Sequence, residues 1–184
     1  MPSGPRISII IPSKNSAATI IDTLDGLLKQ PKRLIKDIVV VDSSTDDSTQ
    51  DMLMKYESAG VRVIHRREAT PAVARNIGVS ACSGAILAFI DADEYPAEDW
   101  CEKIEAAYSA GYPVGGGTRL LAEAQIHNLV PTAQYYLQNS GYFGVGEPQR
   151  RKFVASCNMY CDRDLFRRVG GFPDIRAGNQ MDGF

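Results

Sequence analysis

The feature that most constrains the fold of this chain is the regular alternation of two sequence patterns between residues 6 and 111. Short runs rich in β-branched and other apolar residues are typical of buried strands, and they occupy residues 6–12, 37–42, 61–65 and 85–91. Each run is followed by a segment with helical spacing or helix-start signals, at residues 17–30, 44–60, 71–82 and 96–111. This alternation predicts an α/β fold with a mostly parallel sheet and helices on both faces.

The pattern becomes less regular from residue 112 onward. We expect strands at 113–121 and 152–161, a helical piece near 129–140, and a short helix at 162–172 that ends at Gly170-Gly171. No linker-like stretch separates this region from the first part. We therefore expect one domain over residues 1–184, which is an ordinary size for a single hydrophobic core.

Composition excludes several classes of protein. The net charge of −2 argues against general nucleic-acid binding. The N-terminus has no signal-peptide pattern and no stretch is long enough to span a bilayer, so we expect a cytoplasmic protein. The basic run Arg150-Arg151-Lys152 and the later Arg163, Arg167 and Arg168 suit a phosphate or an anionic membrane surface, which leaves peripheral membrane association open; for any one of them a solvated basic face is the favoured interpretation. Four cysteines without a C-x-x-C pair, beside two histidines, indicate reduced core thiols.

Polar residues follow three of the predicted strands. They form the stretches PSKN at 12–15, DSSTDDST at 42–49 and DADE at 91–94. The carboxyl ends of parallel strands meet at one edge of a sheet, and ligands of open α/β sheets bind there. We therefore expect the three stretches to converge on one ligand.

Two residues near these strand ends suit a nucleotide. Asp42 directly follows an apolar strand and can accept hydrogen bonds from a base N–H or a ribose hydroxyl, although capping of the next helix is an equal alternative. Arg75 can approach phosphates or the base, or it can be an exposed arginine on an amphipathic helix. Gly78, in the same helix, would allow the helix to pack closely on a strand.

Asp91 and Asp93 are candidate metal ligands. They stand two residues apart, which in extended geometry places both side chains on the same side, and Glu94 adds a third carboxylate. Hard oxygen donors suit Mg²⁺ or Mn²⁺ rather than zinc. The alternative is a helix N-terminus before Pro96; we favour the metal because Asp91 ends so apolar a strand.

The order of these pieces resembles a known family. PSKN, VVVDSSTDDST, ARNIGVSACSGAILAFIDADEYP and SCNMYCDRDLFRRVGGFPD follow one another as in the family 2 glycosyltransferases, which have the nucleotide-sugar-binding GT-A fold. The resemblance runs from about Ile7 to about Gly178. It implies a nucleotide-binding half at 1–111 and an acceptor-side half at 112–184 that looks incomplete. It also implies inverting transfer of a sugar from a UDP- or GDP-sugar to a hydroxyl acceptor, glycan or lipid-linked, with Mn²⁺ or Mg²⁺.

The resemblance also assigns roles to individual residues. Those matched to nucleotide binding are Pro12, Ser13, Asn15, Asp42, Arg75, Asp91 and Ala92. Asp93, with Asp91, matches the acids that hold the cation, and Ser156 and Asn158 match the strand on the sugar and acceptor side. Gly170, Gly171 and Phe172 match the turn that leads to the catalytic loop.

The sequence departs from the family where the catalytic base is expected. Asn179 and Gln180 stand in place of an acidic pair, and an amide oxygen has almost no basicity. Asp182 is our candidate base after a local shift, and Asp174, beside Pro173, is the alternative. Family members usually continue beyond the position of Phe184, so we expect a truncated or degenerate member.

Three other functions compete with glycosyl transfer. A non-catalytic nucleotide-sugar-binding module would keep the strand-end acids and lack the base. A nucleotidyltransferase is disfavoured because PSKNSAAT contains no glycine for a triphosphate loop. Dinucleotide binding is disfavoured because no G-x-G-x-x-G follows the first strand. Glycines 115–117 lack the rest of a phosphate loop and instead indicate close approach of backbone or ligand to a strand.

Overall fold

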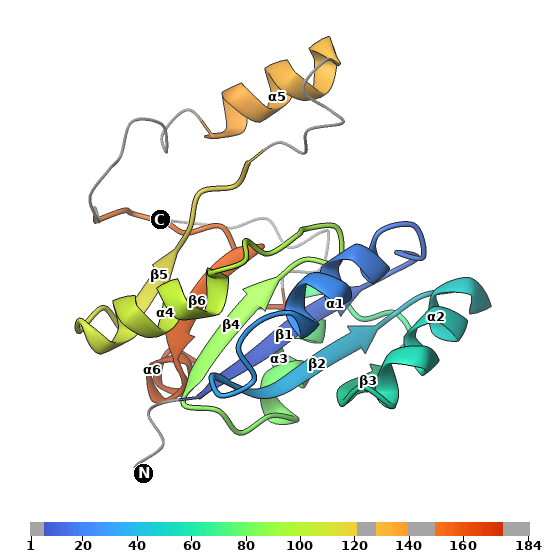
Figure 1. The fold of residues 1–184 in the computed structure, drawn as a ribbon, viewed down its shortest axis with the longest axis horizontal. Helices are drawn as coiled ribbons and strands as arrows, with labels where there is room; N and C mark the ends of the chain where they lie inside the picture. Colours follow the sequence, from blue (N-terminus) through green and yellow to red (C-terminus); the bar gives the residue numbers. More distant parts are fainter. Residues whose placement is uncertain (1–5, 121–127, 140–149, 175–184) are drawn as a thin grey trace.

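The computed structural model of the chain describes residues 6–120, 128–139 and 150–174. Within them, six strands form one sheet in the order β3-β2-β1-β4-β6-β5 (Figure 1). The strands are β1 (Ile7–Ser13), β2 (Ile35–Asp42), β3 (Val61–His65), β4 (Ile86–Ile90), β5 (Val114–Gly116) and β6 (Asn158–Asp162). The helices are α1 (Ile20–Leu28), α2 (Asp47–Glu57), α3 (Pro71–Ser80), α4 (Trp100–Ser109), α5 (Leu129–Asn139) and α6 (Arg163–Arg168).

The sheet is mixed but mostly parallel. β1 pairs in parallel with β2 and β4, and β2 pairs in parallel with β3. β6 runs antiparallel to both of its neighbours, β4 and β5. The predicted α/β class is therefore confirmed, and the first four strands bring their carboxyl ends to one edge of the sheet.

Helices cover both faces of the sheet, as predicted. The larger core cluster joins β1 residues such as Ile9 to Leu24 of α1, Leu53 of α2 and Trp100 of α4. On the other face, Ile10 and Phe89 pack with Val79 of α3 and Phe166 of α6. Neighbouring β1 residues thus face opposite layers, as the pleat of a strand requires. Figure 1 shows α5 standing apart from both layers.

Side-chain caps explain where several helices begin. Asp46 accepts hydrogen bonds from the backbone N–H groups of Ser48 and Thr49 at the start of α2. Thr70 accepts from Val73 N at the start of α3, where Pro71 occupies the first turn. The polar stretch after β2 therefore supplies the cap of α2 through Asp46.

The later region differs from the sequence prediction in its boundaries. The strand expected at 152–161 begins only at Asn158, and the strand expected at 113–121 is limited to Val114–Gly116. The register explains both limits. Asn158 lies opposite Ile90, the last residue of β4, and Gly116 lies opposite Met159 near the start of β6. Among the described residues, one further backbone hydrogen bond, from Gly117 N to the Asn158 carbonyl at 3.3 Å, continues the pairing of β5 with β6.

Two further predictions concern the whole described part of the chain. The four cysteines are free thiols and three of them are buried, which agrees with reduced core cysteines. No helix among the described residues is long and apolar enough to cross a membrane.

Candidate functional site

A cavity of about 450 Å³ lies at the carboxyl ends of β1, β2 and β4. The end of β1 and the loop after it contribute residues 12–16, β2 is followed by the lining residue Ser43, and β4 by residues 91–93. The start of α3 closes another side with Pro71, Ala74 and Arg75. The structure thus brings together the three polar stretches that the sequence predicted to converge.

The loop after β1 is held in shape by the loop after β2. Asn15 has a left-handed backbone (φ 51°), a conformation that asparagine tolerates better than most residues. Its N–H donates to Ser44 Oγ at 2.8 Å, and its Oδ1 accepts from Thr45 N at 2.9 Å. Asn15 therefore lines the cavity mainly as a residue that fixes the two loops to each other.

Asp42 lies beneath these loops. Its side chain has no exposed area, and it is not among the residues that line the cavity. Oδ1 accepts from Ser13 Oγ at 3.0 Å and from Ser44 Oγ at 2.6 Å, while Oδ2 lies 3.3 Å from His65 Nδ1. Direct contact of Asp42 with a base stays a prediction, and it requires a local movement that opens the buried carboxylate to the cavity.

His65 is a residue that the sequence patterns did not indicate. It ends β3 directly opposite Asp42 in the parallel register between β2 and β3. Its imidazole is about half exposed, whereas its carboxylate partner is fully buried. Correct pairing of the two strands, rather than any local motif, would have been needed to find it.

Arg75 and Asp91 form an ion pair that lines the cavity. Arg75 Nη2 lies 2.5 Å from Asp91 Oδ1, and the arginine side chain is only 8% exposed against 34% for the aspartate. The guanidinium also lies over the ring of Phe172, 5.7 Å from its centre. Arg75 thus lines the cavity beside a strand-end carboxylate, and its contact with a ligand stays a prediction.

The two remaining acids of the DADE stretch, Glu94 and Asp93, differ in burial and in their charged partners. Glu94 Oε1 lies 2.5 Å from Arg119 Nη2. Burial raises the pKa of Glu94 above its usual value, and the nearby charges of Asp93 and Asp91 add to this, while Arg119 opposes it. Asp93 lines the cavity, is exposed, and has no hydrogen-bond or ion-pair partner among the described residues.

Arg119 is a second residue that the sequence patterns missed. It follows the glycine run at the end of β5, in the less regular part of the chain, and no motif marks it. Together, Arg119 and Arg75 place positive charge beside two of the three carboxylates after β4. Asp93 is the carboxylate left without a partner in the described part of the chain.

The donor set suits a divalent cation that also binds a ligand. Among the described residues, no group of three or more His, Cys, Asp or Glu side chains could hold a metal by itself. Mg²⁺ is commonly bound by one or two carboxylates together with substrate phosphates. Asp93 and Asp91, two cavity-lining carboxylates, fit this second kind of site.

The residues predicted for the sugar and acceptor side lie beyond the cavity. Ser156 is part of a half-buried turn before β6. Asn158 begins β6; its Oδ1 accepts from Trp100 Nε1 at 2.9 Å, and its Nδ2 donates to the carbonyl of Thr118 at 3.4 Å. A Cβ on Gly116 would lie 2.6 Å from the Asn158 carbonyl oxygen, so the glycine run does allow a close backbone approach.

The turn at Gly170-Gly171-Phe172 is attached to α3 by Asn76. Asn76 Nδ2 donates to the carbonyl of Phe172 at 2.8 Å, and Asn76 Oδ1 accepts from Phe172 N at 3.0 Å. Asn76 thereby holds Phe172 beside Arg75. Asp174, the alternative base, accepts from Thr70 Oγ1 at 3.3 Å. Asp182, Asn179 and Gln180 lie outside the described residues.

A family model for glycosyl transferase family 2 matches residues 8–170 of this chain. The chain belongs to glycosyl transferase family 2. The match includes all three strand ends around the cavity, the Arg75–Asp91 pair and β6. It places the predicted site residues from Pro12 to Asn158 inside the family region.

Curated relatives within glycosyl transferase family 2 are longer than this chain. Glycosyltransferase AglE of Haloferax volcanii is 27% identical over 175 residues, which cover 92% of this chain and 57% of AglE. The pre-mycofactocin glycosyltransferase of Mycobacterium tuberculosis is 26% identical over 193 residues, which cover 98% of this chain and 39% of that protein. The chain therefore spans roughly half of these relatives.

Solved structures confirm the GT-A fold. Residues 1–349 of TarS from S. aureus match with a TM-score of 0.68 and 21% identity, over 94% of this chain and 52% of that one. The mannosyltransferase PcManGT from Pyrobaculum calidifontis, in complex with GDP-Man and Mn²⁺, matches with a TM-score of 0.66 and 22% identity, over 92% and 48% of the two chains. At these identities the likeness shows the fold alone.

Proposed function

We propose that this chain binds a nucleotide-diphospho-sugar in the strand-end cavity and transfers the sugar to a hydroxyl acceptor. The observation that carries this proposal is the single cavity joining the loops after β1 and β2, the start of α3 and the acids after β4. Relatives that were crystallised with UDP-GlcNAc or with GDP-Man and Mn²⁺ support the class of donor. The volume of about 450 Å³ lies within the usual range for small-ligand sites.

The donor is held by groups from all of these segments. The loop at 12–16 and Ser43 face the nucleoside, with Asp42 as the buried acid that organises them and, by the family resemblance, reads the base. Arg75 supplies positive charge toward the diphosphate while its pairing with Asp91 limits the repulsion between that acid and the phosphates. Residues 1–111 act as the donor half in this proposal.

Asp93, with Asp91, holds a divalent cation, Mn²⁺ or Mg²⁺. Phosphate oxygens and the unpartnered Asp93 would otherwise repel each other, because both are anionic and Asp93 has no arginine of its own among the described residues. A bound cation supplies charge neutralisation for the leaving nucleoside diphosphate.

The acceptor half comprises residues 112–184. Ser156 and Asn158 lie on the sugar side, and Asp182 removes the proton from the acceptor hydroxyl. With a carboxylate base opposite the leaving group, the displacement at the anomeric carbon is direct and inverts its configuration.

The test is calorimetric titration of UDP, GDP and CDP with and without Mn²⁺. We expect one diphosphate to bind about 30-fold more tightly, or by ~2 kcal/mol, when Mn²⁺ is present. Asp93→Ala should remove this gain in affinity. Asp51→Ala is the matched control, because Asp51 is an exposed acid on α2, away from the cavity. Binding that ignores both Mn²⁺ and Asp93→Ala would reject the metal part of the proposal.

A non-catalytic nucleotide-sugar-binding module is the second candidate. The observation that favours it is Asn179-Gln180 at the position of the family's acidic pair. Donor hydrolysis or transfer by the chain with Mn²⁺, lost in Asp182→Asn while diphosphate binding is kept, would support the enzyme. Metal-dependent binding with no turnover of any nucleotide sugar would support the module.

A further inference from the structure

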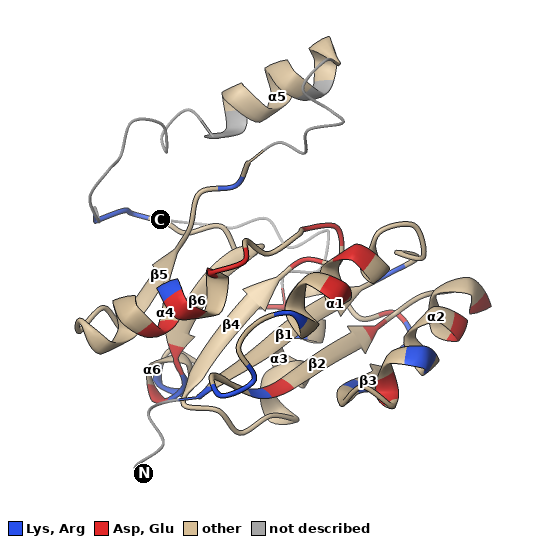
Figure 2. Cartoon of the chain, viewed as in Figure 1, with Lys and Arg blue, Asp and Glu red and all other residues tan. Residues whose placement is uncertain are grey.

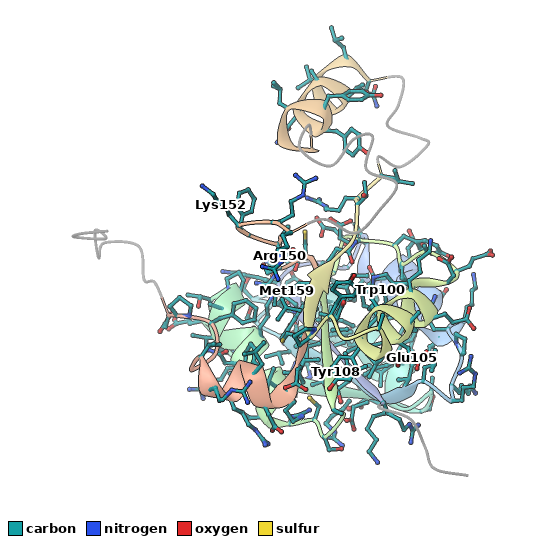
Figure 3. All side chains as sticks on the ribbon, turned by 90° about the vertical axis from the view of Figure 1, so that its left-hand side faces the viewer. Trp100, Glu105, Tyr108, Arg150, Lys152 and Met159 are labelled. Carbon is teal, nitrogen blue, oxygen red and sulfur yellow. The ribbon has the colours of Figure 1, made fainter. Side chains whose placement is uncertain are left out.

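Among the described residues, twelve large apolar side chains are exposed, and six of them lie on three segments: the segment after β5, α5 and the stretch before β6. We call this group the distal patch; its members are Leu120, Leu129, Val130, Tyr136, Leu137 and Phe153. Tyr135 of α5 donates to the carbonyl of Arg119 at 2.8 Å, which links α5 to the segment after β5. Figures 1 and 3 show residues 150–153 on the same side of the sheet as α5.

The helix at the centre of the distal patch is unlike a solvent-exposed helix. Leu129 and Leu137 are 83% and 79% exposed. α5 contains no charged residue, as Figure 2 also shows, whereas a helix surrounded by water is normally polar or charged. Exposed leucine, valine and tyrosine on an uncharged helix indicate a partner with an apolar interior and a polar boundary, where tyrosine rings are favoured.

Basic residues stand beside this apolar surface. Arg150, Arg151 and Lys152 are consecutive and exposed, and they precede Phe153, which is 76% exposed. Figure 3 labels Arg150 and Lys152 on the segment below α5. Residues 128–139 and 150–157 contain no Asp or Glu, so all the charges that these two described segments carry are positive.

The combination of positive charge and exposed apolar area favours one kind of binding partner for the distal patch over another. A second copy of the chain, docked through the same patch about a two-fold axis, would bring a second basic run toward the first, and the two runs would repel. An anionic lipid surface offers negative head groups for the basic run and an acyl boundary for the leucines and tyrosines. We infer that the distal patch docks this chain on an anionic lipid bilayer.

If the proposed function holds, docking on a bilayer also indicates which kind of acceptor the chain uses. The distal patch joins the ends of β5 and β6, next to Asn158 and Arg119, on the proposed acceptor side. A hydroxyl carried by a membrane lipid would then be presented to that side of the cavity. The docking itself does not depend on transfer activity.

The experiment is co-sedimentation of the whole chain with vesicles of phosphatidylcholine alone or with about one third phosphatidylglycerol. We expect binding only to the anionic vesicles, weakened by added salt. A triple Arg150→Ser, Arg151→Ser, Lys152→Ser variant should bind about 100-fold more weakly, at about fivefold per basic residue. A Leu129→Ser, Leu137→Ser variant should bind at least about tenfold more weakly.

A control variant distinguishes binding through the distal patch from binding through the positive charges of the whole surface. Lys32→Ser, Lys36→Ser, Lys55→Ser removes three exposed cations from other parts of the surface and should bind vesicles like the parent. Equal binding by the control and the basic-run variant, equal binding to neutral vesicles, or no binding would overturn the inference. A dimer in analytical ultracentrifugation that the leucine variant dissolves would also overturn it, in favour of a second copy.

Calorimetry with nucleoside diphosphates tests the proposed function independently of membrane docking. The vesicle-binding variants lie outside the cavity and should keep the donor affinity of the parent. A chain that binds anionic vesicles but no diphosphate would reject the proposed function and leave the docking surface standing.

Discussion

Arg75 joins three parts of the structure through its contact with Asp91. Its Nη2 lies 2.5 Å from Asp91 Oδ1, and the same guanidinium lies 5.7 Å from the centre of the Phe172 ring. One buried cation therefore connects α3, the end of β4 and the turn after α6. The next residue, Asn76, binds the backbone of Phe172 on both its N–H and its carbonyl.

Replacing Arg75 by Met should destabilise the fold. The change leaves Asp91 without its cation beside Asp93, which has no partner among the described residues, so two like charges repel at one turn. Because Asp91 is 34% exposed, we expect a loss of ~2 kcal/mol in the free energy of unfolding, less than for a fully buried pair. Urea unfolding of Arg75→Met, Asp91→Asn and the double variant measures it, and the double variant should lose less than the sum.

The matched control is the exposed pair between Arg33 and Glu102. Its side chains are 69% and 50% exposed at a distance of 3.2 Å, so Arg33→Met should cost about 0–1 kcal/mol. If Arg75→Met proves no more harmful than Arg33→Met, the connecting role of Arg75 is wrong.

The two glycines of the turn should respond differently to alanine. Gly170 and Gly171 both have left-handed backbones, with φ of 82° and 79°. A Cβ on Gly170 meets nothing within 4 Å, so Gly170→Ala should cost only the strain of that conformation, ~1 kcal/mol. A Cβ on Gly171 would lie 2.8 Å from Asn76 Oδ1, which is already fixed by Phe172, so Gly171→Ala should cost ~2–3 kcal/mol.

Thermal unfolding of both variants checks this difference. In an Asn76→Ala background the clash is absent, and the two glycine substitutions should then cost about the same. Equal losses in the parent background would mean that Asn76 yields to the new methyl group and does not hold the turn rigidly.

The fold could be predicted because its signals are local. The apolar runs ISIIIPS and IKDIVVVD, the helical spacing of α1 and the capping residues of α2 and α3 can each be read within one segment. The partners of site residues could not be predicted in the same way. The contacts of His65 with Asp42, Arg119 with Glu94 and Asn76 with Phe172 join positions that are far apart in the chain. They depend on strand register and loop placement, which single residues do not encode.

At Gly78 the residue type alone predicted a tertiary contact, the close packing of a helix on a strand. A Cβ at this position would lie 2.5 Å from Ile10 Cγ2, which confirms the expected close approach of α3 to β1. Gly78→Ala should lower the free energy of unfolding by ~1 kcal/mol, because overpacking outweighs the ~1 kcal/mol that alanine gains in a helix.

Urea unfolding of Gly78→Ala with and without Ile10→Ala measures the clash. Ile10→Ala alone should destabilise by leaving a cavity, but in its background Gly78→Ala should become neutral or stabilising. A stabilising effect of Gly78→Ala in the parent would show that α3 can move away from β1 at little cost.

The cysteines give a prediction that depends on pH. Burial raises the pKa of Cys101 and of Cys161 to about 12, and burial also raises the pKa of Cys157. Cys82 is the only one of the four that is not buried. At pH 8 only about one in ten thousand of the thiols with a pKa near 12 is ionised. The native chain should therefore react with iodoacetamide mainly at Cys82. Cys82→Ser should abolish the fast phase of this reaction.

The same thiols should make stability fall in alkali. Their pKa in the unfolded chain is about 8.5, so between about pH 9 and 12 the unfolded state releases protons that the folded state retains, and the free energy of unfolding decreases as pH rises. At pH 9.5 the loss should be ~1 kcal/mol for each of Cys101 and Cys161 relative to pH 7. Urea unfolding at the two pH values measures it, and replacing both residues by alanine should flatten the dependence. A dependence that is equally steep in that double variant would assign it to other groups, such as the tyrosines.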